Sequence, residues 1–150
     1  MVDGKVGFGV IGLGMGAARA RQVANTAGAQ LVAVADLDEA RGKQAQADHG
    51  CEFYADYRQM LEAERPDIAV IATREIGDHF EMAMVAAEAG THIYIEKPVA
   101  ASPAQVDQMV AACAQRDKLL IVACPWRGHP PIQHVAIPLI KAGKIGAPRL

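Results

Sequence analysis

Glycines near the start of the chain have the spacing of a turn that binds phosphate groups. Residues 5–20 read KVGFGVIGLGMGAARA and hold two overlapping G-x-G-x-x-[GA] patterns, at residues 7–12 and at residues 12–17. A phosphate-binding turn of this type follows a strand and opens a helix, whose N-terminal N–H groups face the phosphates. The first pattern leaves only six residues before it, whereas the second leaves KVGFGVI as the strand and MGAARARQVA as the helix. We therefore predict a nucleotide-binding turn that contains Gly12, Leu13, Gly14 and Met15, with the small Ala17 packed against the strand.

An acidic residue ends the next apolar run. Asp36 closes LVAVAD, 22 residues after Gly14, where a carboxylate bonds the ribose hydroxyls of a dinucleotide. The alternative is that Asp36 caps the following helix, for which Asp38 is also available. A carboxylate at this place repels a 2′-phosphate, so the sequence favours NAD over NADP, and Arg41 is the nearest cation that could weaken this preference.

A second group of chemically capable residues ends the run THIYIE. Glu96, Lys97 and Pro98 follow each other there. Ligands of open parallel sheets bind outside the carboxyl ends of the strands, so Lys97 would point into the cofactor crevice. Taken alone, such a turn is more often simply solvated. Its place after a fifth strand of a nucleotide-binding fold makes it a candidate site.

Short apolar runs alternate with helical patterns along the whole chain. The runs predict strands at residues 5–12, 29–36, 52–55, 67–73, 91–96 and 118–123. Helices are expected at residues 15–27, 38–50, 57–65 and 79–90, from Ser102 and Pro103 onward, and at about residues 132–140, where Pro138 should kink or divide the helix. This alternation predicts an α/β protein with a doubly wound parallel sheet of about six strands, the Rossmann fold, and helices on both faces.

The composition narrows the class of protein. With 150 residues, 51% of them apolar, and a formal charge of −2, the chain suffices for one domain with a core. No nucleic-acid or membrane partner is expected. No apolar run approaches the roughly 18 residues of a membrane span, and the start of the chain is not a signal-peptide pattern, so we expect a cytoplasmic protein. The three cysteines lack metal-binding spacing, so no metal is expected. Cys113 should be buried in the core. For Cys124, which follows a predicted strand, burial is favoured over a thiol that approaches a ligand.

Several segments together resemble the Gfo/Idh/MocA oxidoreductases, which include glucose-fructose oxidoreductase and inositol dehydrogenase. The segments are GVIGLGMGA, LVAVADLDEAR, DIAVIAT, His79 ahead of AAEAGTHIYIEKP, and LIKAGKIG, in that order from about residue 5 to residue 150. The resemblance implies an NAD(P)-dependent dehydrogenase that transfers a hydride on a sugar, a polyol or a related hydroxy compound. The expected cofactor is NAD, with NADP as the alternative.

The resemblance also implies roles for individual residues. Lys97 would be the catalytic residue, which donates a hydrogen bond to the substrate hydroxyl and carries a proton. Further cofactor-binding residues would be Ala72, Thr73, His79, Glu96, Lys97 and Arg127. Arg74 stands where the family commonly has proline, and a solvated loop arginine is favoured there over one that binds phosphate. For Trp126, His129 and His134, in a proline-rich segment, the alternatives are substrate binding and a surface position.

Family members continue past the last motif of this chain into a second α/β domain. We expect residues 1–146 to form the dinucleotide-binding domain and residues 147–150 to begin a substrate domain that is truncated or absent. The chain alone should then be inactive, and the full-length form should be a homo-oligomer. Two other readings stay open: a non-catalytic nucleotide-binding or redox-sensing module, and a methyltransferase-type domain that binds S-adenosylmethionine.

Overall fold

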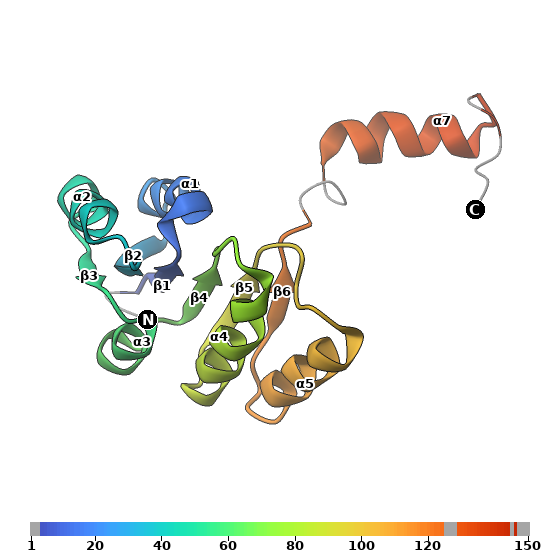
Figure 1. Ribbon diagram of the computed structural model, residues 1–150. Coiled ribbons are helices and arrows are strands. Elements are labelled where there is room, and N and C mark those ends of the chain that lie inside the picture. Colours follow the sequence, from blue (N-terminus) through green and yellow to red (C-terminus); the bar gives the residue numbers. More distant parts are fainter. Residues whose placement is uncertain (1–3, 125–128, 145, 147–150) are drawn as a thin grey trace.

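Six parallel strands form one sheet in the computed structural model, which describes residues 4–124, 129–144 and 146 (Figure 1). The strands are β1 (Val6–Ile11), β2 (Ala29–Ala35), β3 (Glu52–Tyr54), β4 (Ile68–Ile71), β5 (His92–Ile95) and β6 (Leu120–Val122). Their order in the sheet is β3-β2-β1-β4-β5-β6, and every neighbouring pair is parallel. The predicted α/β class and strand number are confirmed. The strand order reverses between β1 and β4, which is where such sheets bind nucleotides.

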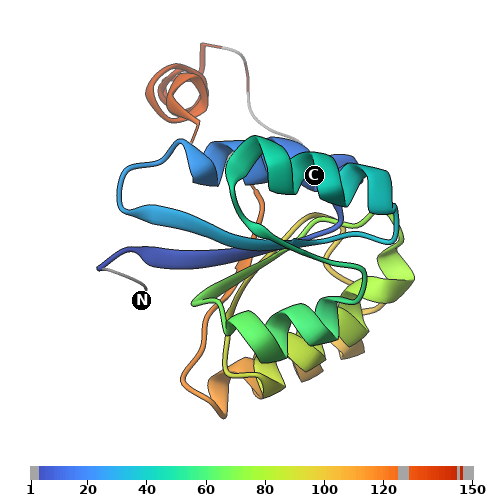
Figure 2. The same ribbon diagram turned by 90° about the vertical axis from the view of Figure 1, so that its left-hand side faces the viewer.

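Helices cover both faces of the sheet, as Figure 2 shows edge-on. One face carries α1 (Leu13–Ala24) and α2 (Glu39–His49), and the other carries α3 (Tyr57–Glu64), α4 (Ile76–Glu88) and α5 (Pro103–Ala114). Each face has its own apolar core. The core beneath α1 and α2 contains Val10, Leu13, Ala20, Leu31, Val34 and Val70. The core beneath the other three helices contains Ile11, Met60, Leu61, Ile71, Ile93, Ile95 and Met109.

The ends of most helices follow from local chemistry. Ser102 Oγ accepts a hydrogen bond from the Gln105 N–H at 3.3 Å, and Pro103 takes the first helical position of α5. Asp38 caps α2, which ends at Gly50 in the left-handed conformation. The helix α4 begins at Ile76, three residues before the expected start. Its N-cap Glu75 makes no side-chain cap bond, so the sequence held no capping signal for this start.

The last helical segment stands apart from the sheet in Figure 1. We call residues 129–144 the arm. Within it a π-helix, η1 (Ile132–Ala136), passes into α7 (Ile137–Lys141). Proline has no N–H and crowds the carbonyl four residues earlier, so Pro138 accounts for the change of helix type. The expected kink or division into two short helices takes the form of this change of helix type, and the helix runs from η1 into α7 without a break.

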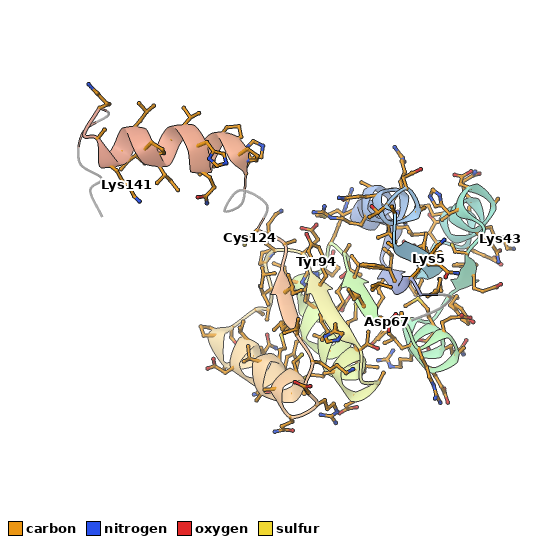
Figure 3. All side chains as sticks on the ribbon, turned by 180° about the vertical axis from the view of Figure 1, so that it is seen from behind. Lys5, Lys43, Asp67, Tyr94, Cys124 and Lys141 are labelled. Atoms are coloured by element: carbon orange, nitrogen blue, oxygen red, sulfur yellow. The ribbon has the colours of Figure 1, made fainter. Side chains whose placement is uncertain are left out.

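The cysteines differ from the expectation at one position. Cys51 and Cys113 are buried, whereas Cys124 is exposed, so the expected burial of Cys124 is wrong. Cys124 lies where the chain leaves the short strand β6 toward the arm (Figure 3). Among the described residues there is no His, Cys, Asp and Glu cluster that could hold a metal ion. No helix in that part of the chain is long and apolar enough to cross a membrane.

Candidate cofactor-binding site

The turn between β1 and α1 requires glycine at its first position. Gly12 is the N-cap of α1 and has a φ of 85°, a conformation that side-chain-bearing residues rarely adopt. A Cβ at Gly12 would lie 2.8 Å from Thr73 Cγ2 and 2.9 Å from the Thr73 backbone nitrogen. The strands β1 and β4 can therefore approach each other here only without a side chain, and the N-terminus of α1 opens at the point where the strand order reverses.

The structure separates the two overlapping glycine patterns. Gly7 and Gly9 lie inside β1, where a Cβ at Gly9 would come within 2.9 Å of Met60 Cε. A side chain at position 9 would therefore require the flexible end of Met60 to move, so the glycine serves the packing of β1 against α3. The register that begins at Gly12 is the one that leads from a strand into a helix, as predicted.

The close packing of α1 against the sheet depends on Gly16. A Cβ at Gly16 would lie 3.0 Å from Val10 Cγ1 and 3.1 Å from Ala72 Cβ. Ala17 is exposed, so the expectation that Ala17 makes this contact is wrong by one position. Helix geometry explains the shift, because α1 begins at Leu13 rather than at Met15 and a different face of the helix meets the sheet.

Asp36 holds the glycine turn from the end of β2. Its Oδ2 accepts a hydrogen bond from the Leu13 N–H at 2.6 Å, and its Oδ1 accepts from the Asp38 N–H at 2.7 Å and from Arg41 Nη2 at 3.2 Å. The residue is 9% exposed. Asp38, and not Asp36, caps α2. The alternative role considered for Asp36 is therefore excluded, and its carboxylate faces the turn.

A cavity of about 770 Å³ lies at this end of the sheet, within the size range of ligand sites. Its lining brings together predicted residues from three loops, namely Gly12, Gly14, Met15, Asp36, Ala72 and Thr73. Arg41 and Arg74 also line it. The atoms Arg41 Nη1 and Arg74 Nε come within 3.6 and 3.9 Å of the point where a Cβ on Gly14 would stand. Two guanidinium groups thus flank the exposed side of the glycine turn.

The carboxyl end of β5 carries the predicted site at Glu96, Lys97 and Pro98. Glu96 is 7% exposed, and its Oε1 accepts hydrogen bonds from Arg19 Nη2 at 2.7 Å and from Arg19 Nε at 3.1 Å. The guanidinium also lies over the ring of Tyr94, 5.6 Å from its centroid, and Figure 3 shows Tyr94 on the sheet. The hydrogen bond to Glu96 is the main cause that raises the pKa of Arg19 above its usual value. Lys97 is exposed.

His79 is buried, at 1% exposure, between two loops. Its Nδ1 lies 2.8 Å from the Pro98 carbonyl oxygen, and its Nε2 lies 3.1 Å from the Thr73 carbonyl oxygen. Both partners are acceptors, so a neutral ring donates to one of them at a time. His79, Glu96 and Lys97 are not among the residues that line the cavity. Glu96 and His79 contact its edge, since the Glu96 N–H donates to the carbonyl of Ile71, which precedes the lining residue Ala72, and His79 faces the carbonyl of Thr73.

Four further residues named in the sequence analysis belong to the last part of the chain. Arg127 and Trp126 fall outside the described residues. His134 is exposed on η1, and His129 is half-buried just before it.

Sequence reasoning missed Arg19 and Gly16. Arg19 and Glu96 are 77 positions apart, so no local pattern links them. Gly16 could have been found from the run GLGMG, in which three alternate residues are glycine.

The strand order, the glycine turn and the acid at the end of β2 together define a dinucleotide-binding domain. Residues 6–124 match the model of an oxidoreductase family with an NAD-binding Rossmann fold. The chain belongs to this family of oxidoreductases, and the resemblance drawn from its motifs is confirmed.

Relatives and solved structures of the family include dehydrogenases of polyols and sugars. The chain is 34% identical over 149 residues to inositol 2-dehydrogenase 1 of Saccharopolyspora erythraea, a match that covers 97% of this chain and 44% of the relative. It is 38% identical over 122 residues to D-apiose dehydrogenase of Paraburkholderia graminis, covering 81% of this chain and 32% of the relative. The scyllo-inositol dehydrogenase of Lactobacillus casei, solved with NAD(H) and scyllo-inositol, superposes with a TM-score of 0.84 at 25% identity, covering 95% of this chain and 42% of that one. The chain thus spans less than half the length of these relatives.

Proposed function

We propose that this chain is the cofactor-binding half of a dehydrogenase that moves a hydride between NAD and a hydroxyl-bearing carbon of a sugar or polyol. The observation that carries the cofactor part is the cavity at the reversal of strand order, where Gly12, Gly14 and Asp36 meet. The relatives named as inositol and apiose dehydrogenases support the substrate class.

The residues present suit two parts of an NAD molecule, the pyrophosphate and one ribose. Gly14 lines the cavity and only the side-chain ends of Arg41 and Arg74 come near its exposed side, so the N–H groups that open α1 could face a pyrophosphate. The Asp36 carboxylate offers about four acceptor positions, and three hydrogen bonds occupy it in the structure. One position is left for a ribose hydroxyl.

Asp36 also favours NAD over NADP, because its negative charge repels a 2′-phosphate. Arg41 is paired with both Asp36 and Asp38, at 3.2 and 3.1 Å, so its charge is already balanced. Binding of NADP would require Arg41 to leave these partners, or Arg74 to take the phosphate.

Lys97 is our candidate for the catalytic residue. Bound NAD⁺ would supply the hydride acceptor. The Lys97 side chain is exposed, directly after Glu96 in the chain, and could donate a hydrogen bond to the substrate hydroxyl. For alcohol oxidation the neutral amine would take up the hydroxyl proton, and for the reverse reaction the ammonium would return it. Glu96 and His79 remain proposed as neighbours of the nicotinamide end of the site, and Arg127 as a cofactor contact.

A methyl group added at Gly14 tests whether the glycine turn binds the cofactor. We expect Gly14→Ala to weaken NAD⁺ binding at least tenfold in calorimetric titration, because the new Cβ would occupy the phosphate side of the turn. The fold should tolerate it, since the nearest atom to that Cβ is 3.6 Å away. Gly77→Ala is the matched control, an exposed helical position with nothing within 4 Å.

Unchanged NAD⁺ affinity in Gly14→Ala would contradict the proposed turn. Binding of S-adenosylmethionine in place of NAD⁺ would overturn the proposed function. The proposed function would also be overturned if the folded chain bound none of the four dinucleotides NAD⁺, NADH, NADP⁺ and NADPH. Asp36→Asn should lower the affinity for NAD⁺ and shift the preference toward NADP⁺.

The assembly and location of the protein are further parts of the proposal. We infer a cytoplasmic homo-oligomer in the full-length form, with no nucleic-acid or membrane partner. The free thiols of Cys51 and Cys113 are typical of a reducing compartment. The net charge of −2 offers no attraction to nucleic acid. Exposed apolar side chains, among them Val135 and Leu139 on the arm, support association, which sedimentation of the full-length form would test.

A further inference from the structure

Lys97 lies between two residues that are each tied to a different helix. On one side, the Glu96 carboxylate is bound by Arg19 of α1. On the other side, the Pro98 carbonyl faces Nδ1 of His79, which belongs to α4. Lys97 itself is exposed between them. The turn is thus held at both of its flanks, while the side chain that would act on a substrate is left accessible.

The Arg19–Glu96 contact is a strong tether. Two donors of one guanidinium converge on Oε1, and the exposed fractions of the two side chains are 30% and 9%. Charge-assisted hydrogen bonds of this kind are roughly twice as strong as neutral ones. Loss of Arg19 would also leave the buried Glu96 carboxylate without this cation, which is costly. The tether therefore resists any movement of Glu96 away from α1.

The same helix carries the glycine turn. Arg19 follows Gly14 by five positions on α1, so the ion pair joins the helix that opens the cofactor cavity to the residue before Lys97. His79 makes the second link, because Nε2 faces the carbonyl of Thr73, and Thr73 lines that cavity. One tether thus runs from the lysine turn to α1, and the other runs through His79 to the loop of Thr73, and both elements border the proposed cofactor site.

We propose that Arg19 and His79 are positioning residues, which fix Lys97 relative to the cofactor. The inference rests on the proposed function, in which Lys97 acts on the substrate hydroxyl. Placement of a reacting group to a fraction of an ångström matters for proton transfer, and a displacement of about 1 Å can cost a hundredfold in rate. Arg19 and His79 act through Lys97 and need not touch the substrate.

The test follows the backbone amide of Lys97 by ¹⁵N NMR in the full chain. In the wild type we expect the order parameter of a rigid backbone, about 0.85, and in Arg19→Gln a fall below about 0.6. Glu96→Gln, which keeps the side-chain size, should give a smaller fall. His79→Gln should also lower the order of Lys97. The shift of this amide on addition of NAD⁺ should shrink at least threefold in Arg19→Gln.

Two controls separate local order from general loss of stability. Arg21→Gln removes an exposed arginine from the same helix and should leave Lys97 unchanged. Asp67→Ala removes a hydrogen bond to Gly7 at the other end of the sheet and should lower stability without mobilising Lys97. If Arg19→Gln does not fold, the isosteric Glu96→Gln shows whether the Arg19–Glu96 pair orders the backbone of Lys97.

A rigid Lys97 amide in both Arg19→Gln and Glu96→Gln would overturn the positioning role, whatever NAD⁺ does. Failure of the wild type to bind NAD⁺ would instead overturn the proposed function. The order parameter of the ligand-free chain would still report on the two tethers.

Discussion

Tyr54 and Glu64 show how one hydrogen bond changes the acidity of a side chain. The phenol oxygen of Tyr54, at the end of β3, donates to Glu64 Oε1, at the end of α3, over 2.5 Å. This bond is the largest of the causes that raise the pKa of Tyr54 to about 12. Ionisation of the phenol would place two negative charges against each other, so the neutral form is favoured.

We expect Tyr54 to titrate late in a spectrophotometric titration at 295 nm. Glu64→Gln should bring its pKa down toward 10, the ordinary value, and Tyr54→Phe should remove the late component. Because the folded pKa is above the unfolded one, the stabilisation is complete below about pH 10 and is lost as the pH rises toward about 12. A Tyr54 that titrates with the other tyrosines would contradict this bond.

The pKa of Asp67 is shifted in the opposite direction to that of Tyr54. Its Oδ2 accepts a hydrogen bond from the Gly7 N–H at 2.7 Å, the main cause that lowers the pKa of this carboxyl group. Its stabilising contribution is present above the unfolded pKa and disappears as the pH falls through the lower folded value.

Asp67→Ala should therefore lower the free energy of unfolding by about 1 kcal/mol at pH 7. The difference from the wild type should shrink as the pH falls below about 4, where the unfolded carboxyl is protonated. Urea unfolding at several pH values measures both effects. Equal losses at pH 7 and pH 3 would argue against an ionic contribution of Asp67.

Between elements, close contacts decide which residues are tolerated. A Cβ at Gly42 of α2 would lie 1.9 Å from Cε2 of Phe53 in β3. Helix propensity alone favours alanine over glycine by about 1 kcal/mol. Here the ring of Phe53 takes the space, so α2 can lie against β3 only with glycine at this position.

We expect Gly42→Ala to destabilise the chain by about 1–3 kcal/mol, the usual cost of overpacking. Combined with Phe53→Leu, which removes the ring, the cost of the alanine should become small or change sign. Thermal unfolding of the two single variants and the double variant measures this coupling. Additive effects would show that the cost of the alanine does not come from the ring of Phe53.

The elements that the sequence predicted well are those with local signals. The caps at Ser102 and Asp38, the stop at Gly50 and the alternating apolar runs each follow from neighbouring residues. The glycine turn and the acid of the candidate site were also predictable from local signals, since Gly12 follows β1 and Asp36 follows β2 within one βαβ unit. Contacts between distant segments were not predictable. Arg19 meets Glu96 across 77 positions, and the packing role of Gly16 depends on where α1 begins.

In the whole molecule, the two apolar cores and the sheet form one body, from which the arm extends (Figures 1 and 2). The arm exposes Val135 and Leu139, so its apolar side chains add little to the stability of that body. Shortening the chain to residues 1–124 should lower the midpoint of thermal unfolding by less than about 2 °C, since a shift of 1 kcal/mol moves it by about 4 °C or less in a chain of this size.

Most of the affinity for NAD⁺ should survive this truncation, because the described residues that line the cavity all precede Cys124, although the shortened chain lacks the proposed cofactor contact Arg127. Calorimetry on the shortened chain measures it. A large fall in the midpoint of thermal unfolding would mean that the arm folds back on the sheet in solution, whereas a large fall in NAD⁺ affinity alone would point to the loss of Arg127.

The extended arm has a consequence for how the chain diffuses and scatters. A compact chain of 150 residues has a radius of gyration of about 15 Å. A helix that projects from the sheet adds long interatomic vectors without adding volume. Small-angle X-ray scattering should therefore give a larger radius and a pair-distance distribution with a tail on its long side, and the shortened chain should return a symmetric, bell-shaped curve.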